Sequence, residues 1–365
     1  MLKAAVYVGA VLSVLASGAA QADILIGVAG PRSGGYANFG EQVFQGADLA
    51  VKEINAKGGV LGEKLKLVVG DDACDPKQAV SVANQFANEG VVFVAGHFCS
   101  GSSIPASAVY QDEGIVMMSF SSTNPKLTEQ GFANIYRVCG RDDQQGPVAA
   151  ALIADRFKGE KIAILHDKTG YGKGLADSTK AQLNARGIQE TMYEAYTAGE
   201  KDYSALVTKM KQAGIGVIYL GGYHSEGGLI IRQAREQGLQ ARMISGDGLA
   251  TSEFGQIAGK AADGTLFTFT PDPRKDKANA PIVEAFRASG YEPEGYTLNS
   301  YAIIQIFAQA AAQAKSTKAE ALNKVLHSAT FTSLLGKVEF DAKGDPKSPG
   351  YKIYEWKNGS FDYMQ

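Results

Sequence analysis

Residues 24–59 read ILIGVAGPRSGGYANFGEQVFQGADLAVKEINAKGG, and this stretch predicts one strand followed by one helix. The run Ile24–Ala29 is almost continuously apolar, which is typical of a strand buried on both faces of a parallel sheet. Over Gln42–Ala56 the apolar residues recur at the spacing of one face of an amphipathic helix. The pair Gly58-Gly59 then ends this helix, because glycine readily adopts the left-handed conformation found after helix C-termini.

The same order of strand and helix repeats along the chain. Further short apolar runs predict strands at Lys66–Gly70, Val91–Gly96, Val116–Phe120, Lys161–His166, Gly216–Gly221, Met243–Ser245 and Thr265–Thr270. Longer segments between them predict helices at Gln78–Asn88, Gly174–Ala185, Ser204–Ala213 and Ser225–Gln237. This alternation predicts a doubly wound α/β fold with parallel sheets. At the end of the chain, Tyr351–Trp356 and Phe361–Tyr363 flank Asn358-Gly359 and predict a β-hairpin.

The length of the chain predicts two domains. Its 365 residues exceed the ~250–300 residues at which a single core stops growing. The strand and helix pattern runs through about four strands, meets the polar stretch Cys139–Gln145, and begins again at Lys161. We place the boundary there. Because no low-complexity linker separates the halves, we expect several tight crossovers rather than one flexible tether.

The N-terminus has the features of a secretion signal. Lys3 precedes an apolar run that ends at Leu15, and a small-residue stretch then closes with Ala20-Gln21-Ala22. The alternative is a membrane anchor, but a spanning helix needs ~20 predominantly apolar residues and this run is shorter. We therefore predict a signal peptide over residues 1–22, cleavage after Ala22, and a soluble exported protein.

Composition and charge limit the possible ligands. The formal net charge is −2 and the basic residues form no cluster, which argues against nucleic acid or an anionic membrane as partner. A small ligand in a local pocket is expected instead. In an oxidising compartment Cys74 and Cys99 can pair, leaving Cys139 unpaired, although three reduced and buried thiols remain the alternative. The four histidines show no metal-ligand spacing, so we expect no metal site and no cofactor.

Enzyme motifs are missing. Residues 27–35 read GVAGPRSGG, which is neither G-x-G-x-x-G nor a Walker A loop. Tyr223 stands where a nucleophile elbow at Ser225 would need glycine, and no HExxH occurs. We expect a protein that is not an enzyme, with an exported hydrolase as the alternative, because catalytic triads can assemble from distant positions.

Several blocks spread over the chain resemble one family. Residues 71–80 (DDACDPKQAV) and 96–100 (GHFCS) closely resemble the leucine/isoleucine/valine-binding proteins of bacterial ABC transporters. The similarity extends through residues 54–59 (INAKGG), 166–168 (HDK), Tyr171-Gly172, 198–202 (AGEKD), 221–223 (GGY) and 232–234 (RQA). These blocks lie in order over nearly the whole exported chain.

The resemblance implies the fold of a type I periplasmic binding protein. Two α/β lobes are then joined by three crossovers, with residues 23–141 plus 271–347 in one lobe and 142–270 plus 348–365 in the other. It also implies a Cys74–Cys99 disulfide, which leaves Cys139 as a small buried hydrophobe. The expected protein is a periplasmic monomer that passes a free amino acid to an inner-membrane ABC permease.

A zwitterionic ligand needs donors for its carboxylate. Ser100 follows the strand Val91–Gly96 and precedes a helix that we expect to start near Ser102, with Pro105 in its first turn. Free backbone N–H groups at a helix start suit a carboxylate. Ser100 alone could equally be a helix cap, but the resemblance places it at the family's carboxylate-binding serine.

Three polar residues follow the strand Val116–Phe120, where ligands gather in open α/β sheets. We expect the Thr123 hydroxyl to accept from the ligand's ammonium. Relatives often carry alanine at the positions of Ser121 and Ser122, so a polar turn without contact to the ligand is the alternative for these two residues.

Asp247 matches the family's acidic residue for the ligand's ammonium, where relatives usually have glutamate. A turn aspartate between two glycines is the alternative. Tyr171, Tyr223 and Tyr296 match aromatic positions that exclude water and donate hydrogen bonds. With sixteen tyrosines in the chain, ordinary packing is the alternative for each one.

Two phenylalanines are expected to shape the side-chain pocket. By resemblance, Phe39 replaces a tryptophan or tyrosine of the pocket wall, and Phe98 replaces a common leucine. We predict that Phe98 shortens the pocket and shifts preference toward small or linear amino acids, including γ-aminobutyrate. A ligand-binding sensor of the same fold, which signals to a membrane receptor, is the alternative function.

Overall fold

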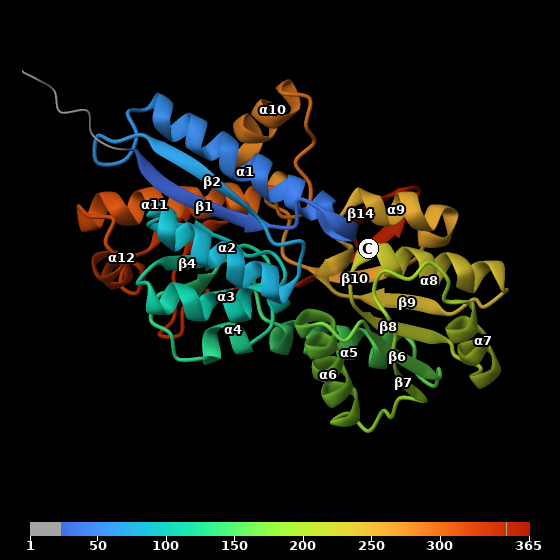
Figure 1. The fold of residues 1–365 in the computed structure, drawn as a ribbon. Helices are drawn as coiled ribbons and strands as arrows, with labels where there is room; N and C mark the ends of the chain where they lie inside the picture. The colour runs from blue at the N-terminus through green and yellow to red at the C-terminus, as the bar shows by residue number, and fades with distance from the viewer. Residues whose placement is uncertain (1–22, 348) are drawn as a thin grey trace, which may run out of the picture.

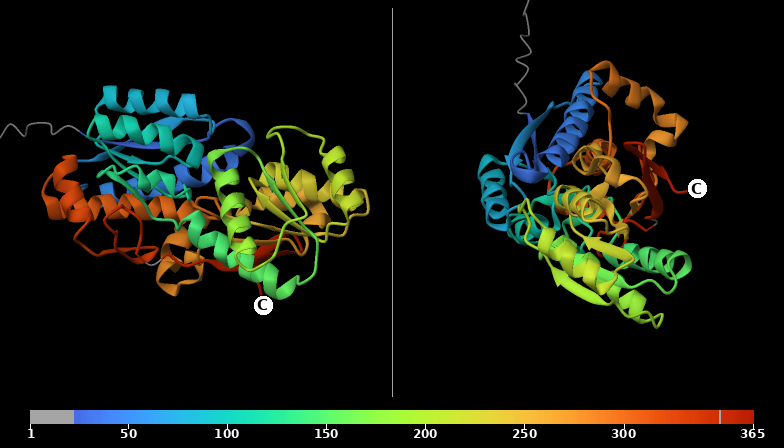
Figure 2. Two further views of the ribbon diagram at one scale, coloured as in Figure 1. Left: turned by 90° about the horizontal axis from the view of Figure 1, so that it is seen from below. Right: turned by 90° about the vertical axis from the view of Figure 1, so that its right-hand side faces the viewer.

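The computed structural model describes residues 23–347 and 349–365, so the predicted signal peptide lies outside the described residues. Two groups of helices and strands lie side by side along the long axis of the molecule (Figure 1). The chain passes between them three times, after β5, after β10 and before β13. In Figure 2 the red C-terminal segment runs from the first group to the second. This arrangement confirms the predicted two-lobed α/β fold with three crossovers.

The first lobe contains a parallel sheet of order β2-β1-β3-β4-β5. Its strands are β1 (Ile24–Gly30), β2 (Leu65–Asp71), β3 (Phe93–Ala95), β4 (Val116–Ser119) and β5 (Ile135–Arg137). The helices of this lobe are α1 (Ala37–Ala56), α2 (Pro76–Glu89), α3 (Ser100–Asp112), α4 (Lys126–Glu129), α10 (Ala280–Ala288), α11 (Thr297–Ala314) and α12 (Ala319–Leu326). A small hairpin of β11 (Phe331–Ser333) and β12 (Gly336–Val338) completes it.

The second lobe contains a sheet of order β14-β13-β10-β9-β8-β6-β7. Its strands are β6 (Ile162–His166), β7 (Met192–Ala195), β8 (Val217–Gly221), β9 (Arg242–Ser245), β10 (Leu266–Phe269), β13 (Lys352–Lys357) and β14 (Ser360–Tyr363). The helices are α5 (Asp142–Arg156), α6 (Gly170–Asn184), α7 (Ser204–Ala213), α8 (His224–Glu236) and α9 (Ser252–Ala258). Short 3-10 turns are η1 (Gly34–Tyr36), η2 (Asp247–Leu249), η3 (Gly259–Ala262), η4 (Pro273–Lys275) and η5 (Lys277–Asn279). Strands β13 and β14 form the predicted antiparallel hairpin.

Both faces of the first sheet are buried, as its apolar strands predict. Ile26 and Val28 of β1 point into the core shared with α1 and α11, whereas Ala29 faces the core under α2 and α3. Local signals set the helix ends. Asp75 caps α2 by accepting from the backbone N–H of Lys77 and Gln78, at 2.9 and 2.8 Å, and Gly90 ends this helix in the left-handed conformation.

The predicted start of the helix after β3 is wrong. Helix α3 begins at Ser100, because the carbonyl of Cys99 already accepts from the N–H groups of Ser102 and Ser103 at 2.9 Å. Pro105 therefore lies in the second turn rather than the first. Since proline has no N–H, the carbonyl of Gly101 receives no helical hydrogen bond from position 105.

Candidate functional site

A small cavity lies between the two lobes, at the carboxyl ends of strands of both sheets. Its volume is about 10 Å³, and its walls are formed by Phe98, Ser100, Ser121, Tyr171, Tyr223, Asp247, Gly248 and Tyr296. Seven of these residues belong to the set expected from sequence to hold or shape the ligand site. Their positions in the chain span almost 200 residues, so only the tertiary fold brings them together.

Two helix N-termini point toward this cavity. Ser100 is the first residue of α3, and Tyr171 is the second residue of α6, whose N-cap Thr169 accepts from the N–H of Gly172 at 3.0 Å. The two starts nearly touch, because a Cβ added to Gly170 would lie 3.4 Å from Gly101. Each helix start carries partial positive charge, so this side of the cavity suits a carboxylate.

Asp247 occupies another wall of the cavity and is held by neutral donors. Its side chain is 4% exposed and accepts from Tyr171 Oη and Gln145 Nε2, each at 2.9 Å, and also from Tyr296 Oη. Gln145 also holds the backbone, because its Oε1 accepts from the N–H of Asp247 at 3.1 Å. Burial raises the pKa of Asp247, while the hydrogen bonds from Tyr296, Gln145 and Tyr171 partly oppose this rise. A cationic group would favour its ionised form.

A second buried acid lies near Asp247. Asp142 begins α5, and neither of its carboxylate oxygens has a hydrogen-bond partner among the described residues. Burial, followed by the charge of Asp247, raises the pKa of Asp142 to about 8. The two carboxylates therefore resist being ionised together.

Aromatic rings form the remaining walls. Phe39 does not line the cavity but stacks on Phe98, with ring centroids 4.6 Å apart. Tyr296 meets the ring of Phe98 edge-on at 5.1 Å, and Tyr171 lies 4.9 Å from Tyr223. Phe39 also meets Tyr223 of the second lobe edge-on at 6.4 Å, so rings of both lobes form one cage around the cavity. Such a cage excludes water and leaves little room for a large side chain.

The three polar residues after β4 do not act alike. Ser121 lines the cavity, yet its hydroxyl donates to the carbonyl of Phe98 at 2.8 Å. Ser122 lies behind it and hydrogen bonds Ser103 and the carbonyls of His97 and Phe98. Thr123 is buried, is not part of the cavity wall, and its hydroxyl has no hydrogen-bond partner among the described residues. The serine hydroxyls therefore brace the loop that carries Phe98 and Ser100.

The same loop is anchored by a disulfide and by a buried histidine. Cys74 and Cys99 are bonded, with their Cα atoms 5.5 Å apart, whereas Cys139 is free and buried. His97 contacts Asp72 through Nδ1 at 2.6 Å and the hydroxyl of Tyr110 through Nε2 at 2.8 Å. Both anchors fix the chain directly before Ser100.

Direct contacts between the lobes surround the cavity. The ring of Tyr36 packs against that of Tyr223 with the ring centroids 4.5 Å apart, and the hydroxyl of Ser225 donates to the carbonyl of Gly35 at 2.8 Å. On another side, Asn124 Nδ2 donates to the carbonyl of Gly170 at 2.6 Å. The lobes are thus in contact around the site, which separates it from bulk solvent.

Sequence reasoning missed Gln145, Tyr36 and Asn124. Gln145 belongs to the polar stretch that we interpreted as a lobe boundary. Its side chain is fully buried, which the composition of that stretch does not indicate. Across residues 23–347 and 349–365, no three His, Cys, Asp or Glu side chains gather in a way that could hold a metal ion. No helix of the described chain has the length and apolarity to span a membrane.

Comparisons with known proteins agree with this geometry. The sequence profile of the family described as periplasmic binding protein matches residues 23–360. A Leu/Ile/Val-binding protein homolog of Brucella abortus (strain 2308) is 53% identical over 352 residues, which cover 95% of each chain. An amino acid binding protein of Pseudomonas aeruginosa is 51% identical and covers 92% of this chain and 91% of its own.

Solved structures show the same fold. The leucine binding protein LivK of Thermotoga maritima superposes with a TM-score of 0.87 at 27% identity, covering 94% of this chain and 98% of its own. A second structure is the branched-chain amino acid transporter substrate binding protein LivJ of Streptococcus pneumoniae in complex with isoleucine. It superposes with a TM-score of 0.85 at 28% identity, covering 93% of this chain and 98% of its own.

Proposed function

The chain belongs to the periplasmic binding protein family, and we propose that it captures free amino acids outside the cytoplasm for an ABC importer. The family consists of substrate-binding proteins of transporters rather than enzymes. The observation that carries the proposal is the cavity itself, where two helix starts and a buried carboxylate occupy different walls between the lobes. That arrangement matches the two charges of a zwitterion.

Each end of the ligand has a defined partner in this proposal. Ser100 and the N–H groups at the start of α3 bind the carboxylate, with the start of α6 adding positive potential. Asp247 binds the ammonium, and its three neutral donors leave the charge of the carboxylate uncompensated until a cation arrives.

Binding is coupled to hinge closure. The first lobe, residues 23–141 plus 271–347, presents Phe39, Phe98 and Ser100, and the second lobe, residues 142–270 plus 348–365, presents Tyr223 and Asp247. A ligand that touches both lobes favours the closed arrangement, and an inner-membrane permease can distinguish that shape from an open one. We propose that the exported protein is a periplasmic monomer whose signal peptide is removed.

The pocket favours short or linear amino acids. Phe98 is buried against Phe39 and Tyr296, so it fills space that a branched side chain would need. Asp247 is one methylene shorter than glutamate, which leaves more distance between it and Ser100. Alanine and γ-aminobutyrate are therefore the expected ligands, with leucine weaker. A sensor of the same fold would use the same site but a receptor in place of a permease.

Calorimetry on the exported chain, stripped of carried-over solute, tests this function. Leucine, isoleucine, valine, alanine and γ-aminobutyrate are titrated into the wild type and into the double variant Ser100→Ala/Asp247→Ala. The expected result is binding of at least one amino acid that the double variant loses. Absence of binding at millimolar ligand, or full binding by the double variant, would overturn the proposal.

A further inference from the structure

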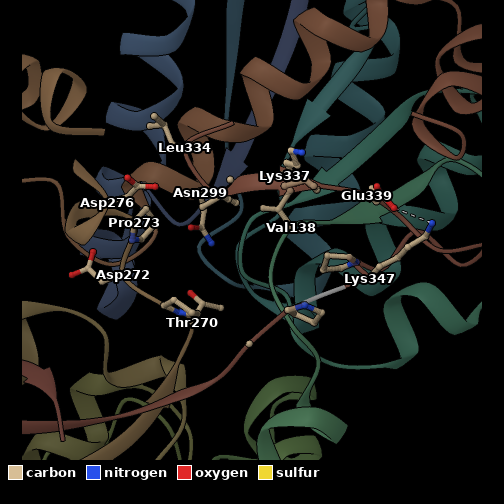
Figure 3. A pocket seen from close by; sticks show the side chains of 17 residues that line it. Val138, Thr270, Asp272, Pro273, Asp276, Asn299, Leu334, Lys337, Glu339 and Lys347 are labelled. Atoms are coloured by element: carbon tan, nitrogen blue, oxygen red, sulfur yellow. Dashed lines mark hydrogen bonds and ion pairs between the residues drawn. The ribbon is translucent and has the colours of Figure 1, made fainter. Parts of the chain in front are cut away.

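A second cavity of the described chain lies away from the cleft between the lobes and is larger than the cleft cavity. It has a volume of about 480 Å³, within the ~300–1,000 Å³ typical of small-molecule sites, and shares no lining residue with the cleft cavity. Figure 3 shows its walls, with Asn299, Val138 and Thr270 in the middle of the view.

Segments at all three passages between the lobes line this cavity. Val138 follows β5 at the first passage, 270–273 form the second, and Pro346, Lys347, Pro349 and Gly350 belong to the third. Rotation of one lobe against the other must change the backbone in these segments. The shape of the cavity therefore depends on the angle between the lobes, and an occupant that fits one angle stabilises it.

The two ends of the cavity differ in charge. Asp272 and Asp276 lie on the left in Figure 3, whereas Lys337 lies beside Val138 and Lys347 lies further to the right. Arg274 pairs with Asp272 at 2.8 Å, so two acids and one base leave a net charge of −1 at the first end. Glu339 pairs with Lys347 at 3.2 Å, so two bases and one acid leave +1 at the second.

A buried amide and an apolar surface lie between these ends. Asn299 is 2% exposed, and its Nδ2 donates to the carbonyl of Phe120 at 3.1 Å, which leaves Oδ1 as an acceptor toward the cavity. Val138 and Leu334 supply apolar contacts beside it. A ligand that satisfies this lining needs a cationic end, an anionic end, and an N–H donor between them.

We propose that this hinge cavity binds a short peptide with free termini. The amino terminus lies toward Asp272 and Asp276, the carboxylate toward Lys337 and Lys347, and a peptide N–H donates to Asn299. A peptide places its two terminal charges further apart than a single α-amino acid, which carries both on one carbon. Because the cavity contacts every passage between the lobes, the peptide changes the affinity of the cleft for its amino acid, and the coupling is reciprocal.

Calorimetry with trialanine on the exported chain tests the site. Trialanine binds and its N-acetylated, C-amidated form does not, because both terminal charges are required. Lys337→Glu weakens trialanine binding about two- to fivefold, as expected for an exposed charge contact. The matched control Lys324→Glu makes the same charge change on an exposed lysine of α12 outside the cavity and leaves the affinity unchanged.

A variant that disables the cleft distinguishes binding in the hinge cavity from binding in the cleft. Ser100→Ala/Asp247→Ala retains trialanine binding whether or not the wild type binds an amino acid, so the result does not depend on the proposed function. For any amino acid that the wild type binds, saturating trialanine shifts its affinity about fivefold or more. No trialanine binding, loss in the double variant, equal effects of the two lysine variants, or an unshifted amino-acid affinity would each overturn the proposal.

Discussion

Phe98→Leu should convert a binder of small amino acids into a better binder of leucine. The ring of Phe98 is buried, stacks on Phe39 at 4.6 Å and meets Tyr296 edge-on at 5.1 Å, in a cavity of about 10 Å³. Replacing the ring by a leucyl side chain opens space on the cavity side. Room for one extra methylene in an apolar pocket changes discrimination by about 10- to 200-fold.

The measured quantity is the ratio of the leucine and alanine dissociation constants from calorimetry. We expect this ratio to change in favour of leucine by about tenfold or more in Phe98→Leu. The unfolding temperature should fall modestly, because a core ring is lost.

Phe120→Leu is the matched control. Phe120 is fully buried and its ring lies 6.0 Å from that of Phe98, but it is not part of the cavity wall. It should lower stability without changing the ratio. If Phe98→Leu is folded and keeps the wild-type ratio, or if both variants change it equally, Phe98 does not set the length of the pocket.

Three further predictions concern buried groups. Asp247→Asn should weaken amino-acid binding about 10- to 150-fold, the value of a lost charge-assisted hydrogen bond; unchanged affinity would contradict this. The pKa of Asp142 is raised from 3.8 to about 8, so the folded protein holds a proton that the unfolded chain lacks, and this group makes the free energy of unfolding fall as pH rises through that window. In urea titrations at several pH values, the free energy of unfolding of Asp142→Asn should depend less steeply on pH than that of the wild type. An identical slope in the two proteins would refute this prediction. Cys74→Ser/Cys99→Ser removes a disulfide that spans 25 residues and should cost about 3 kcal/mol of unfolding free energy in urea; reduced wild type should lose a similar amount.

Much of the fold could be predicted from sequence because the parallel strands are apolar on both faces. Strands β1 and β8 fall within one residue of their predicted ends, and α7 has its predicted bounds. The strands that were missed are β5, β7, β11 and β12, which are only three or four residues long. So short a segment shows neither a clear apolar run nor a clear alternation, for which a strand of about 4–8 residues is needed.

The start of α3 was misplaced for a different reason. Pro105 is typical of a first helical turn, but here it lies inside the helix, in the second turn. The sequence pattern therefore shifted the predicted start by two residues. The correction matters for the site, since it makes Ser100 part of the helix start itself.

The site could be predicted only in part. Residues that line the cavity were found through the family resemblance, which carries the positions of Ser100, Tyr171 and Tyr223. Gln145 was not found, because a glutamine in a polar stretch gives no sign that it will be fully buried. Its contacts with Asp247 depend on the distance between α5 and η2, which only the packed second lobe determines.

These contacts explain how an aspartate can serve at the proposed ammonium position, where the family resemblance leads us to expect a glutamate. Asp247 is short, and a free aspartate beside two glycines could turn in several directions. Gln145 holds its backbone and its carboxylate together, and Tyr171 and Tyr296 approach the carboxylate as further donors. The carboxylate is thus fixed in a retracted position by groups that do not neutralise it. Retraction lengthens the distance from Ser100, and Phe98 shortens the space for a side chain, so both changes favour a longer, unbranched zwitterion over a branched one.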